Sequence, residues 1–305
     1  MNNLIVFTLS SNKKVAKKVA DSLCAELGNV FVDKFADGEI LVKSANNVQG
    51  KDVLVIESTA KKAPEKLFEL LLLADSIKRS GARSIRLYIP YFGYSRQERV
   101  SWTNEPVSCE VVAKILDTAK FDEILTFDIH HPDIKNFFKT SFTSLSPAPI
   151  FGDYFKDYLQ KYNISEKDVV VVSPDHGSNA RADALCKEIG DVEKVILTKV
   201  RPHPNMAEHL EVEVEKVKNK VCIIFDDIID TGGTIISAVK LLKNSGARLV
   251  LVGACHPVFS SDSQSKLLAC GLEDIVVTNT IEKTLKAGVN FVDISSLITE
   301  HERKR

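Results

Sequence analysis

The sequence lacks the features of a membrane, secreted or zinc-cluster protein. Its longest apolar runs, such as residues 221–225 and 249–255, have the length of strands and fall far short of the roughly 20 residues that span a bilayer. Residues 1–20 lack the ordered basic, apolar and small-residue segments of a secretion signal. Six cysteines occur without a paired CxxC spacing or a neighbouring His at zinc-site intervals. These absences predict a cytoplasmic protein with reduced cysteines and no transmembrane segment.

The chain also lacks an excess of charge of either sign. Its 40 Lys and Arg residues oppose 41 Asp and Glu residues, which gives a formal net charge of −1. No overall field favours nucleic acid or an anionic membrane, so neither is expected as a partner, and any anion site must be local. Low-complexity sequence is absent as well. What remains is a chain of 305 residues with 44% hydrophobic content, a length that favours two domains.

Short β-rich apolar segments alternate with stretches of helical period along the whole chain, which predicts an α/β fold with mainly parallel sheets. The first strand is expected at residues 4–8. A helix is then expected to carry an apolar stripe from Val15 to Leu27 and to end at Gly28. The Ser- and Pro-rich residues 141–149 follow neither period, so they are the expected linker between two α/β domains.

The remaining strands are expected where short apolar segments recur. In the first half these are residues 53–57, 85–90 and 124–127; in the second half they are residues 169–172, 194–198, 221–225, 249–255 and 274–277. Because the second half repeats the layout of the first, the pattern suggests a duplicated α/β domain.

The strongest local signal is the segment VCIIFDDIIDTGGT, in which an apolar strand leads through acidic residues into a glycine turn that opens a helix. Gly232 and Gly233 let the backbone turn tightly, so that several N–H groups can face one phosphate. Thr231 and Thr234 add hydroxyl donors after Asp230, and the helix dipole favours an anion. The segment predicts a phosphate site. A helix cap followed by a glycine turn is the structural alternative.

Two adjacent carboxylates precede this loop at the expected carboxyl end of a strand, where open α/β sheets place their ligands. Asp226 and Asp227 can accept hydrogen bonds from vicinal hydroxyls or hold a cation beside the phosphate. A pentose phosphate satisfies both halves of the pattern. The stretch resembles the PRPP-binding motif shared by phosphoribosyltransferases and PRPP synthetases, and it does not separate these two families.

Four further segments separate the two families. They are FADGE at residues 35–39, IPYFGYSRQER at 89–99, SPDHG at 173–177 and KVRP at 199–202. In order and spacing they resemble the successive motifs of the PRPP synthetase (ribose-phosphate pyrophosphokinase) family, from about residue 4 to about residue 297. Phosphoribosyltransferases are similar only around residues 226–234.

The resemblance implies two phosphoribosyltransferase-like α/β domains, each with a mainly parallel sheet flanked by helices. The N-terminal domain, on the ATP side, would comprise residues 1–145 and about 286–305, and the C-terminal domain, which would bind ribose 5-phosphate, residues 146–285. The implied reaction transfers the pyrophosphoryl group of MgATP to the C1 hydroxyl of ribose 5-phosphate, with Mg²⁺ as cofactor. A homo-oligomer, a dimer or larger, is implied because the adenine clamp of this family completes a neighbouring subunit's site.

The implied ribose 5-phosphate site consists of the acidic pair and the glycine loop. Its residues are Asp226, Asp227, Asp230, Thr231, Gly232, Gly233 and Thr234.

A loop in the first half carries groups suited to adenosine. Phe35 offers an aromatic face to a purine, while Asp37 and Glu39 offer acceptors to an exocyclic amine or to ribose hydroxyls. The alternative is a plain Asp-Gly turn after a strand, because that dipeptide is frequent in turns.

A second loop carries groups suited to a triphosphate. Arg96 and Arg99 present planar, permanently charged forks to phosphate oxygens, and Gln97 can read an adenine edge. A solvated basic loop is the alternative.

His130 and Asp175 each follow an expected strand. By resemblance, His130 lies near the ATP phosphates and the metal, and Asp128 can fix its tautomer. Asp175, in VVVVSPDHGS, is the matching candidate for a Mg²⁺ site built mostly from water, phosphate and a carboxylate. A structural histidine is the alternative for His130.

Lys199 and Arg201 end an expected strand and begin a charged segment, up to Lys220, that resembles the mobile catalytic loop of the family. These cations would stabilise charge on the transferred β-phosphoryl group and on the departing AMP. Two surface cations beside a turn are the alternative.

Three short segments depart from the family pattern. Residues 100–104 carry no positive charge where relatives are strongly basic, so ADP is expected to inhibit only by competing with ATP. The usual HxxQIQxFF becomes HHPDIKNFF at 130–138, and Ser178 replaces a glycine. Two other functions therefore stay open: a phosphoribosyltransferase that consumes PRPP, and a non-catalytic relative that binds a true synthetase.

Overall fold

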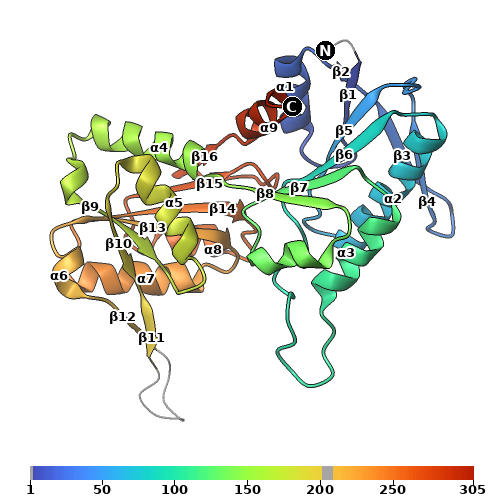
Figure 1. The fold of residues 1–305 in the computed structure, drawn as a ribbon. Coiled ribbons are helices and arrows are strands. Elements are labelled where there is room, and N and C mark those ends of the chain that lie inside the picture. The colour runs from blue at the N-terminus through green and yellow to red at the C-terminus, as the bar shows by residue number, and fades with distance from the viewer. Residues whose placement is uncertain (1–2, 201–208) are drawn as a thin grey trace. The chain divides into compact units, whose positions relative to one another are not determined.

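The structure, a computed structural model, describes residues 3–200 and 209–305. The chain divides into two compact units (Figure 1). Unit 1 comprises Met1–Leu145, Thr280–Glu282 and Asp293–Arg305, and unit 2 comprises Ser146–Asn279 and Lys283–Val292. Each unit contains a six-stranded parallel sheet, so the predicted α/β class is confirmed. In the described part of the chain, no helix has both the length and the apolar character needed to cross a membrane.

Unit 1 is built on six parallel strands of mostly continuous apolar sequence. In their order across the sheet they are β2 (Glu26–Leu27), β1 (Leu4–Phe7), β5 (Asp52–Ile56), β6 (Ser84–Ile89), β7 (Glu123–Phe127) and β8 (Ser141–Leu145). Such apolar strands suit a parallel sheet whose two faces are both buried.

Helices cover both faces of this sheet. α2 (Ala63–Arg79) and α3 (Ser108–Thr118) pack their apolar stripes against the alternate strand residues of one face. On the other side, α1 (Lys13–Leu23) and α9 (Ser295–Arg303) lie next to each other although they come from opposite ends of the chain (Figure 1). A two-stranded antiparallel hairpin, β3 (Val30–Lys34) and β4 (Ile40–Ser44), contacts α2.

Two expectations for unit 1 are wrong. The first helix ends at Leu23, because Cys24 adopts a left-handed conformation with φ of 50°, and Leu27 then pairs with β1 in the edge strand β2. Leu27 continues the four-residue spacing of a helix in the sequence, but its backbone is extended because it pairs with β1. Residues 141–145 are the edge strand β8 rather than a linker; their alternating Ser and Thr hid the strand.

Unit 2 repeats the arrangement with its own six parallel strands. In their order across the sheet they are β10 (Glu193–Ile196), β9 (Val169–Ser173), β13 (Val221–Ile229), β14 (Leu249–Pro257), β15 (Asp274–Thr278) and β16 (Val289–Val292). A short antiparallel pair, β11 (Thr198–Val200) and β12 (His209–Glu211), forms a separate ladder.

Two apolar clusters lie on the two faces of the unit 2 sheet. α4 (Ala148–Lys161) and α5 (Asn179–Ile189) contribute to one cluster, and α7 (Gly233–Asn244) and α8 (Ser263–Leu268) contribute to the other. The single-turn helix α6 (Val214–Val217) adds Val217 to the second cluster.

The two sheets share one strand order. Numbered in sequence within each sheet, the strands run 2-1-3-4-5-6 in both units, so β1 and β5 correspond to β9 and β13. The order reverses between the first and third strands, and open α/β sheets bind ligands at such a switch point, beyond the carboxyl ends of the strands. The fold therefore indicates one candidate position in each unit.

Candidate active site

The switch point of unit 2 brings together three predicted carboxylates. Asp175 follows β9, and Asp226 and Asp227 lie near the end of β13. The strand runs on to Ile229, beyond the predicted residue 225, because Asp226 and Ile228 pair with β14. β9 pairs with β13 only as far as Ile224, so both aspartates lie past the end of that pairing.

Ser178 connects these carboxylates and was not among the predicted site residues. Its hydroxyl donates to Asp226 Oδ1 at 2.8 Å, and its backbone N–H donates to Asp175 Oδ1 at 3.0 Å. The N–H of Asp227 donates to the same Asp226 oxygen at 2.9 Å. In the sequence, Ser178 was only a departure from a family motif. Its position directly before α5 was the one available signal.

Burial and charge set the protonation of this cluster. Burial first, and the neighbouring Asp227 charge second, raise the pKa of Asp226 to about 7. The hydrogen bond from Ser178 acts in the opposite direction. Arg181 Nη2, on α5, lies 3.7 Å from Asp227 Oδ2, and both side chains are largely buried. The cluster thus offers carboxylate oxygens as acceptors with a guanidinium beside them.

The glycine loop follows β13 directly and opens α7. Gly232 has φ of 80°, and a Cβ there would lie 3.2 Å from the Leu267 side chain, so both the turn and the close approach require glycine. Gly232, at the N-cap of α7, has no side chain with which to cap the first turn of the helix. Thr231 and Thr234 are exposed around these backbone N–H groups. This is the geometry of a helix N-terminus able to receive a phosphate.

In unit 1, the predicted ATP residues follow two neighbouring strands. Arg96, Gln97 and Arg99 are exposed in the loop after β6, and His130 is half-buried after β7. The loop is anchored because the N–H of Cys109, in α3, donates to the Gln97 carbonyl at 3.1 Å. Parallel neighbouring strands end at one sheet edge, so the two loops that carry these four residues begin at the same edge.

The predicted adenosine residues belong to a different element of unit 1, the turn between β3 and β4. The N–H of Phe35 donates to the Glu39 carbonyl at 2.8 Å, and the N–H of Glu39 donates to Asp37 Oδ1 at 3.1 Å. Gly38 supplies the turn with φ of 94°. All three predicted side chains are exposed. The Asp-Gly turn is thus present, and it presents these side chains outward.

The two predicted catalytic cations fall at the border of the described chain. Lys199 lies in β11, where it pairs with Leu210, and Arg201 lies outside the described residues.

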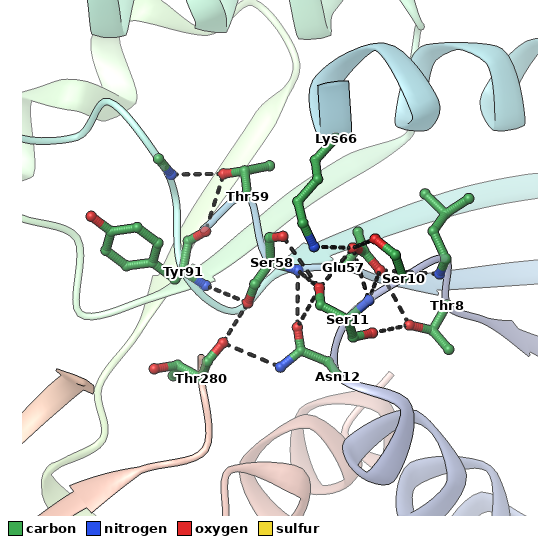
Figure 2. Close-up of polar contacts among 12 residues, drawn as sticks. Thr8, Ser10, Ser11, Asn12, Glu57, Ser58, Thr59, Lys66, Tyr91 and Thr280 are labelled. Carbon is green, nitrogen blue, oxygen red and sulfur yellow. Dashed lines mark hydrogen bonds and ion pairs between the residues drawn. The ribbon is translucent and has the colours of Figure 1, made fainter. Parts of the chain in front are cut away.

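A polar cluster at the switch point of unit 1 was not predicted (Figure 2). Glu57 directly follows β5 and is fully buried. Its carboxylate accepts from the N–H groups of Leu9 and Ser11 at 3.0 and 3.1 Å, and from the Ser11 hydroxyl at 2.7 Å. Lys66 Nζ, on α2, lies 2.8 Å from it. The sequence signal was an acidic residue directly after the apolar run VLVI, as in the VCIIFDD segment.

A segment from late in the chain completes this cluster. The Ser58 hydroxyl and Asn12 Nδ2 both donate to the Thr280 carbonyl, the latter at 3.2 Å (Figure 2). Asn12 Oδ1 accepts from the Ser58 N–H at 2.9 Å. The loop after β1 is therefore held to the end of β5 and to Thr280 within unit 1.

The donor chemistry of Asp175 fits a magnesium ion. Its carboxylate is half-buried, and Mg²⁺ binds through one or two carboxylates while water and phosphate supply the other ligands. Within residues 3–200 and 209–305, no group of three or more His, Cys, Asp or Glu side chains is gathered as a ligand set. This donor set suits a metal that arrives with a nucleotide better than a structural metal.

Comparisons with known proteins show the family to which the chain is related. Residues 4–119 match the N-terminal domain of ribose phosphate pyrophosphokinase, and residues 142–283 match the phosphoribosyl transferase domain. The ribose-phosphate pyrophosphokinase of Bacillus caldolyticus is 40% identical over 280 residues, and that of Corynebacterium ammoniagenes is 37% identical. In both cases the alignment covers 92% of this chain and 86% of the relative.

A solved structure extends the likeness to the whole fold. The phosphoribosylpyrophosphate synthetase of Mycobacterium smegmatis superposes with a TM-score of 0.88 at 31% identity, over 99% of this chain and 98% of that one. The match of residues 4–119 separates the chain from phosphoribosyltransferases, as the four motifs indicated. The chain belongs to the ribose-phosphate pyrophosphokinase family.

Proposed function

We propose that the chain transfers the pyrophosphoryl group of ATP to the C1 hydroxyl of ribose 5-phosphate, giving PRPP and AMP, and that the pentose binds at the switch point of unit 2. One observation carries the assignment of this site. Asp226 and Asp227 lie in β13 beyond the end of its pairing with β9, shortly before the glycine loop that opens α7 at the N-cap residue Gly232. Hydroxyl acceptors beside a phosphate position are what a pentose phosphate requires.

The pentose site acts mainly by binding and orientation. Asp226 and Asp227 accept hydrogen bonds from the vicinal hydroxyls, and the backbone N–H groups of residues 230–234 hold the 5-phosphate together with Thr231 and Thr234. Fixing the sugar in this way holds its C1 hydroxyl in one orientation for attack on a β-phosphorus. Phosphoryl transfer asks for positioning and charge stabilisation more than for covalent chemistry.

Unit 1 supplies the nucleotide site. Arg96 and Arg99 bind phosphate oxygens, Gln97 reads the adenine edge, and His130 lies beside the phosphates. Phe35, Asp37 and Glu39 clamp the adenosine of a neighbouring subunit, which makes the protein a homo-oligomer, a dimer or larger. Their outward orientation at the hairpin end supports this role.

Lys199 and Arg201 are the catalytic residues. They stabilise the charge that develops on the β-phosphoryl group and on the leaving AMP. Asp175 in unit 2 and His130 in unit 1 are the two candidate residues for holding Mg²⁺, with water and phosphate oxygens as further ligands, and the ion would supply positive charge to the nucleotide. The enzyme works in the cytoplasm, where ATP and ribose 5-phosphate are its substrates.

Release of AMP from MgATP tests this function. Purified protein is assayed with and without ribose 5-phosphate, beside a Lys199→Ala variant. The expected result is AMP that depends on the sugar, equals PRPP in amount, and is lost in the variant. A well-folded protein that releases no AMP would contradict the proposal in favour of the non-catalytic relative. Base-dependent loss of PRPP without AMP would point to a phosphoribosyltransferase.

Inhibition by ADP is expected to be purely competitive with ATP. The loop at residues 100–104 has no cation to bind a second diphosphate, and it instead exposes Val100 and Trp102. Initial rates at several fixed ADP concentrations would show a raised KM for ATP and an unchanged kcat. A lowered kcat at saturating ATP would mean that a separate ADP site exists.

A further inference from the structure

We propose that Ser178 is a positioning residue for ribose 5-phosphate, because its hydroxyl fixes the orientation of the Asp226 carboxylate in the pentose site. This inference rests on the proposed function, since it assigns Ser178 to the substrate site placed in unit 2. It goes beyond the acidic pair and the glycine loop by naming a residue from a different segment of the chain.

The position of Ser178 in the fold allows this role. It directly precedes α5, which begins at Asn179, and only 3% of its surface is exposed. The loop after β9 thereby reaches the end of β13, 48 residues later in the chain, through one short hydroxyl contact of 2.8 Å. A buried hydroxyl with a fixed partner loses little freedom when substrate arrives.

The geometry at Asp226 shows what the contact does. Two donors, the Ser178 hydroxyl and the Asp227 N–H, approach the same oxygen, Oδ1. With one oxygen held from two directions, the plane of the carboxylate is set, and so is the position of Oδ2. The Asp226 side chain, which also interacts with the Asp227 side chain, then offers a sugar hydroxyl an acceptor of fixed orientation. The bond also offsets the repulsion between two adjacent carboxylates, since it stabilises the charged form of one of them.

The same residue has a second contact that a test can keep intact. The backbone N–H of Ser178 donates to Asp175 Oδ1 at 3.0 Å, and this bond does not depend on the side chain. Ser178→Ala therefore removes the link to Asp226 while preserving the link to Asp175. The substitution separates sugar positioning from any effect on the candidate metal ligand.

The expected effect falls on the KM for ribose 5-phosphate. Loss of one hydrogen bond that orients a charged acceptor is expected to raise this KM by roughly 3- to 10-fold. The KM for ATP and kcat should change by less than about 2-fold, because the contact acts on substrate binding rather than on charge development. Ser178→Thr, which keeps the hydroxyl, should restore the KM for ribose 5-phosphate.

A matched variant controls for loss of a buried hydroxyl as such. Ser263, in α8 of the same unit, is 1% exposed, and its hydroxyl has no hydrogen-bond partner in the described part of the chain. Ser263→Ala should leave both KM values unchanged. Thermal unfolding of each variant shows whether a kinetic change accompanies a loss of stability.

A double-mutant cycle with Asp226→Asn, followed by calorimetric binding of ribose 5-phosphate, tests whether Ser178 acts through Asp226. Ser178→Ala should weaken binding in the wild-type background and have no further effect beside Asp226→Asn. An equal effect in both backgrounds, or an unchanged KM and affinity in an active Ser178→Ala enzyme, would overturn the inference alone. A wild-type protein without sugar-dependent AMP release would instead overturn the proposed function.

Discussion

The two units place different chemistry at the same point of the same sheet. Near the end of β13, unit 2 has two carboxylates, then a glycine loop and a helix whose N-cap residue is Gly232. At the end of β5, unit 1 has one buried carboxylate, Glu57, that accepts hydrogen bonds from the loop after β1 and an ion pair from Lys66 (Figure 2). The first arrangement leaves donors for a ligand, whereas the second directs its donors to the protein's own anion.

This difference shows how a duplicated fold can keep a binding position in one copy and close it in the other. In unit 1, N–H groups and hydroxyls converge on a carboxylate much as they would on a phosphate oxygen. Lys61 and Lys62, with φ of 46° and 49°, stand before α2 where unit 2 has Gly232 before α7. Non-glycine residues in that conformation carry strain that glycine avoids. Unit 1 thus uses the switch point for stability.

The largest expected effect comes from removing the acceptors of unit 2. Replacing Asp226 and Asp227 together by Ala should lower kcat/KM for ribose 5-phosphate by roughly 100-fold or more, because each lost contact involves a charged acceptor. Steady-state AMP release measures this loss. Asp153→Ala, an exposed aspartate on α4, is the matched control and should keep full activity. Near-normal kinetics in the double variant would show that the pentose does not bind at this position.

Removing the internal anion of unit 1 should affect stability and leave sugar binding intact. Glu57→Ala leaves Lys66, whose side chain is 13% exposed, without its ion pair, and should lower the free energy of unfolding by about 3–5 kcal/mol. Urea unfolding gives this value. Glu57→Gln keeps the shape and should cost less. Added acetate or formate is expected to restore part of the lost stability of Glu57→Ala. An unfolding midpoint of Glu57→Ala equal to that of the wild type would contradict a stabilising role of this carboxylate.

Substitutions at two glycines of unit 2 can distinguish the effect of backbone strain on stability from the effect of loop geometry on substrate binding. Gly232 and Gly271 both have positive φ, at 80° and 91°, but only a Cβ at Gly232 would meet another side chain. Alanine at either position should lower the free energy of unfolding by about 1–2 kcal/mol through strain. Only Gly232→Ala should also raise the KM for ribose 5-phosphate. Equal kinetic effects from both variants would show that the glycine loop has no special role.

The smallest expected effect is a pH-dependent gain of stability on neutralising Asp226. Its folded pKa of about 7 lies above the unfolded value of 3.8, so the folded state holds a proton that the unfolded state releases between these values. The free energy of unfolding therefore falls as pH rises from about 4 to about 7. Asp226→Asn should be more stable than the wild type by about 1–2 kcal/mol at pH 8 and equal to it near pH 4. Melting curves without Mg²⁺ would detect this, and a pH-independent difference would argue against it.

The central strands and the glycine loop were predictable from sequence because their signals are local. A short continuous apolar run such as that of β13 is typical of a strand buried on both faces of a parallel sheet. The segment Asp-Thr-Gly-Gly-Thr combines a turn, hydrogen-bond donors and a helix start within five residues. Of the four strands at the edges of the two six-stranded sheets, β10 was predicted and the other three were not. β2, β8 and β16 are short or polar, and only pairing with a neighbour defines them.

The interior of the candidate site was only partly predictable. Asp175 and Asp226 each follow an apolar strand, but the bridge through Ser178 depends on two loops that meet only in the folded sheet. Glu57 carried the same signal as Asp226, an acidic residue after a buried strand, and its opposite use depends on how Leu9 and Ser11 are placed. Sequence alone does not report whether the donors around a carboxylate are already satisfied.

The number of ribose 5-phosphate molecules bound per chain shows whether one unit or both units bind the pentose. Calorimetric titration of the wild type should give one site, the same site in Glu57→Gln, and none after replacing Asp226 and Asp227 by Ala. Two sites per chain, or binding that survives loss of both aspartates, would contradict the claim that unit 2 holds the pentose phosphate while unit 1 fills the corresponding position with its own carboxylate.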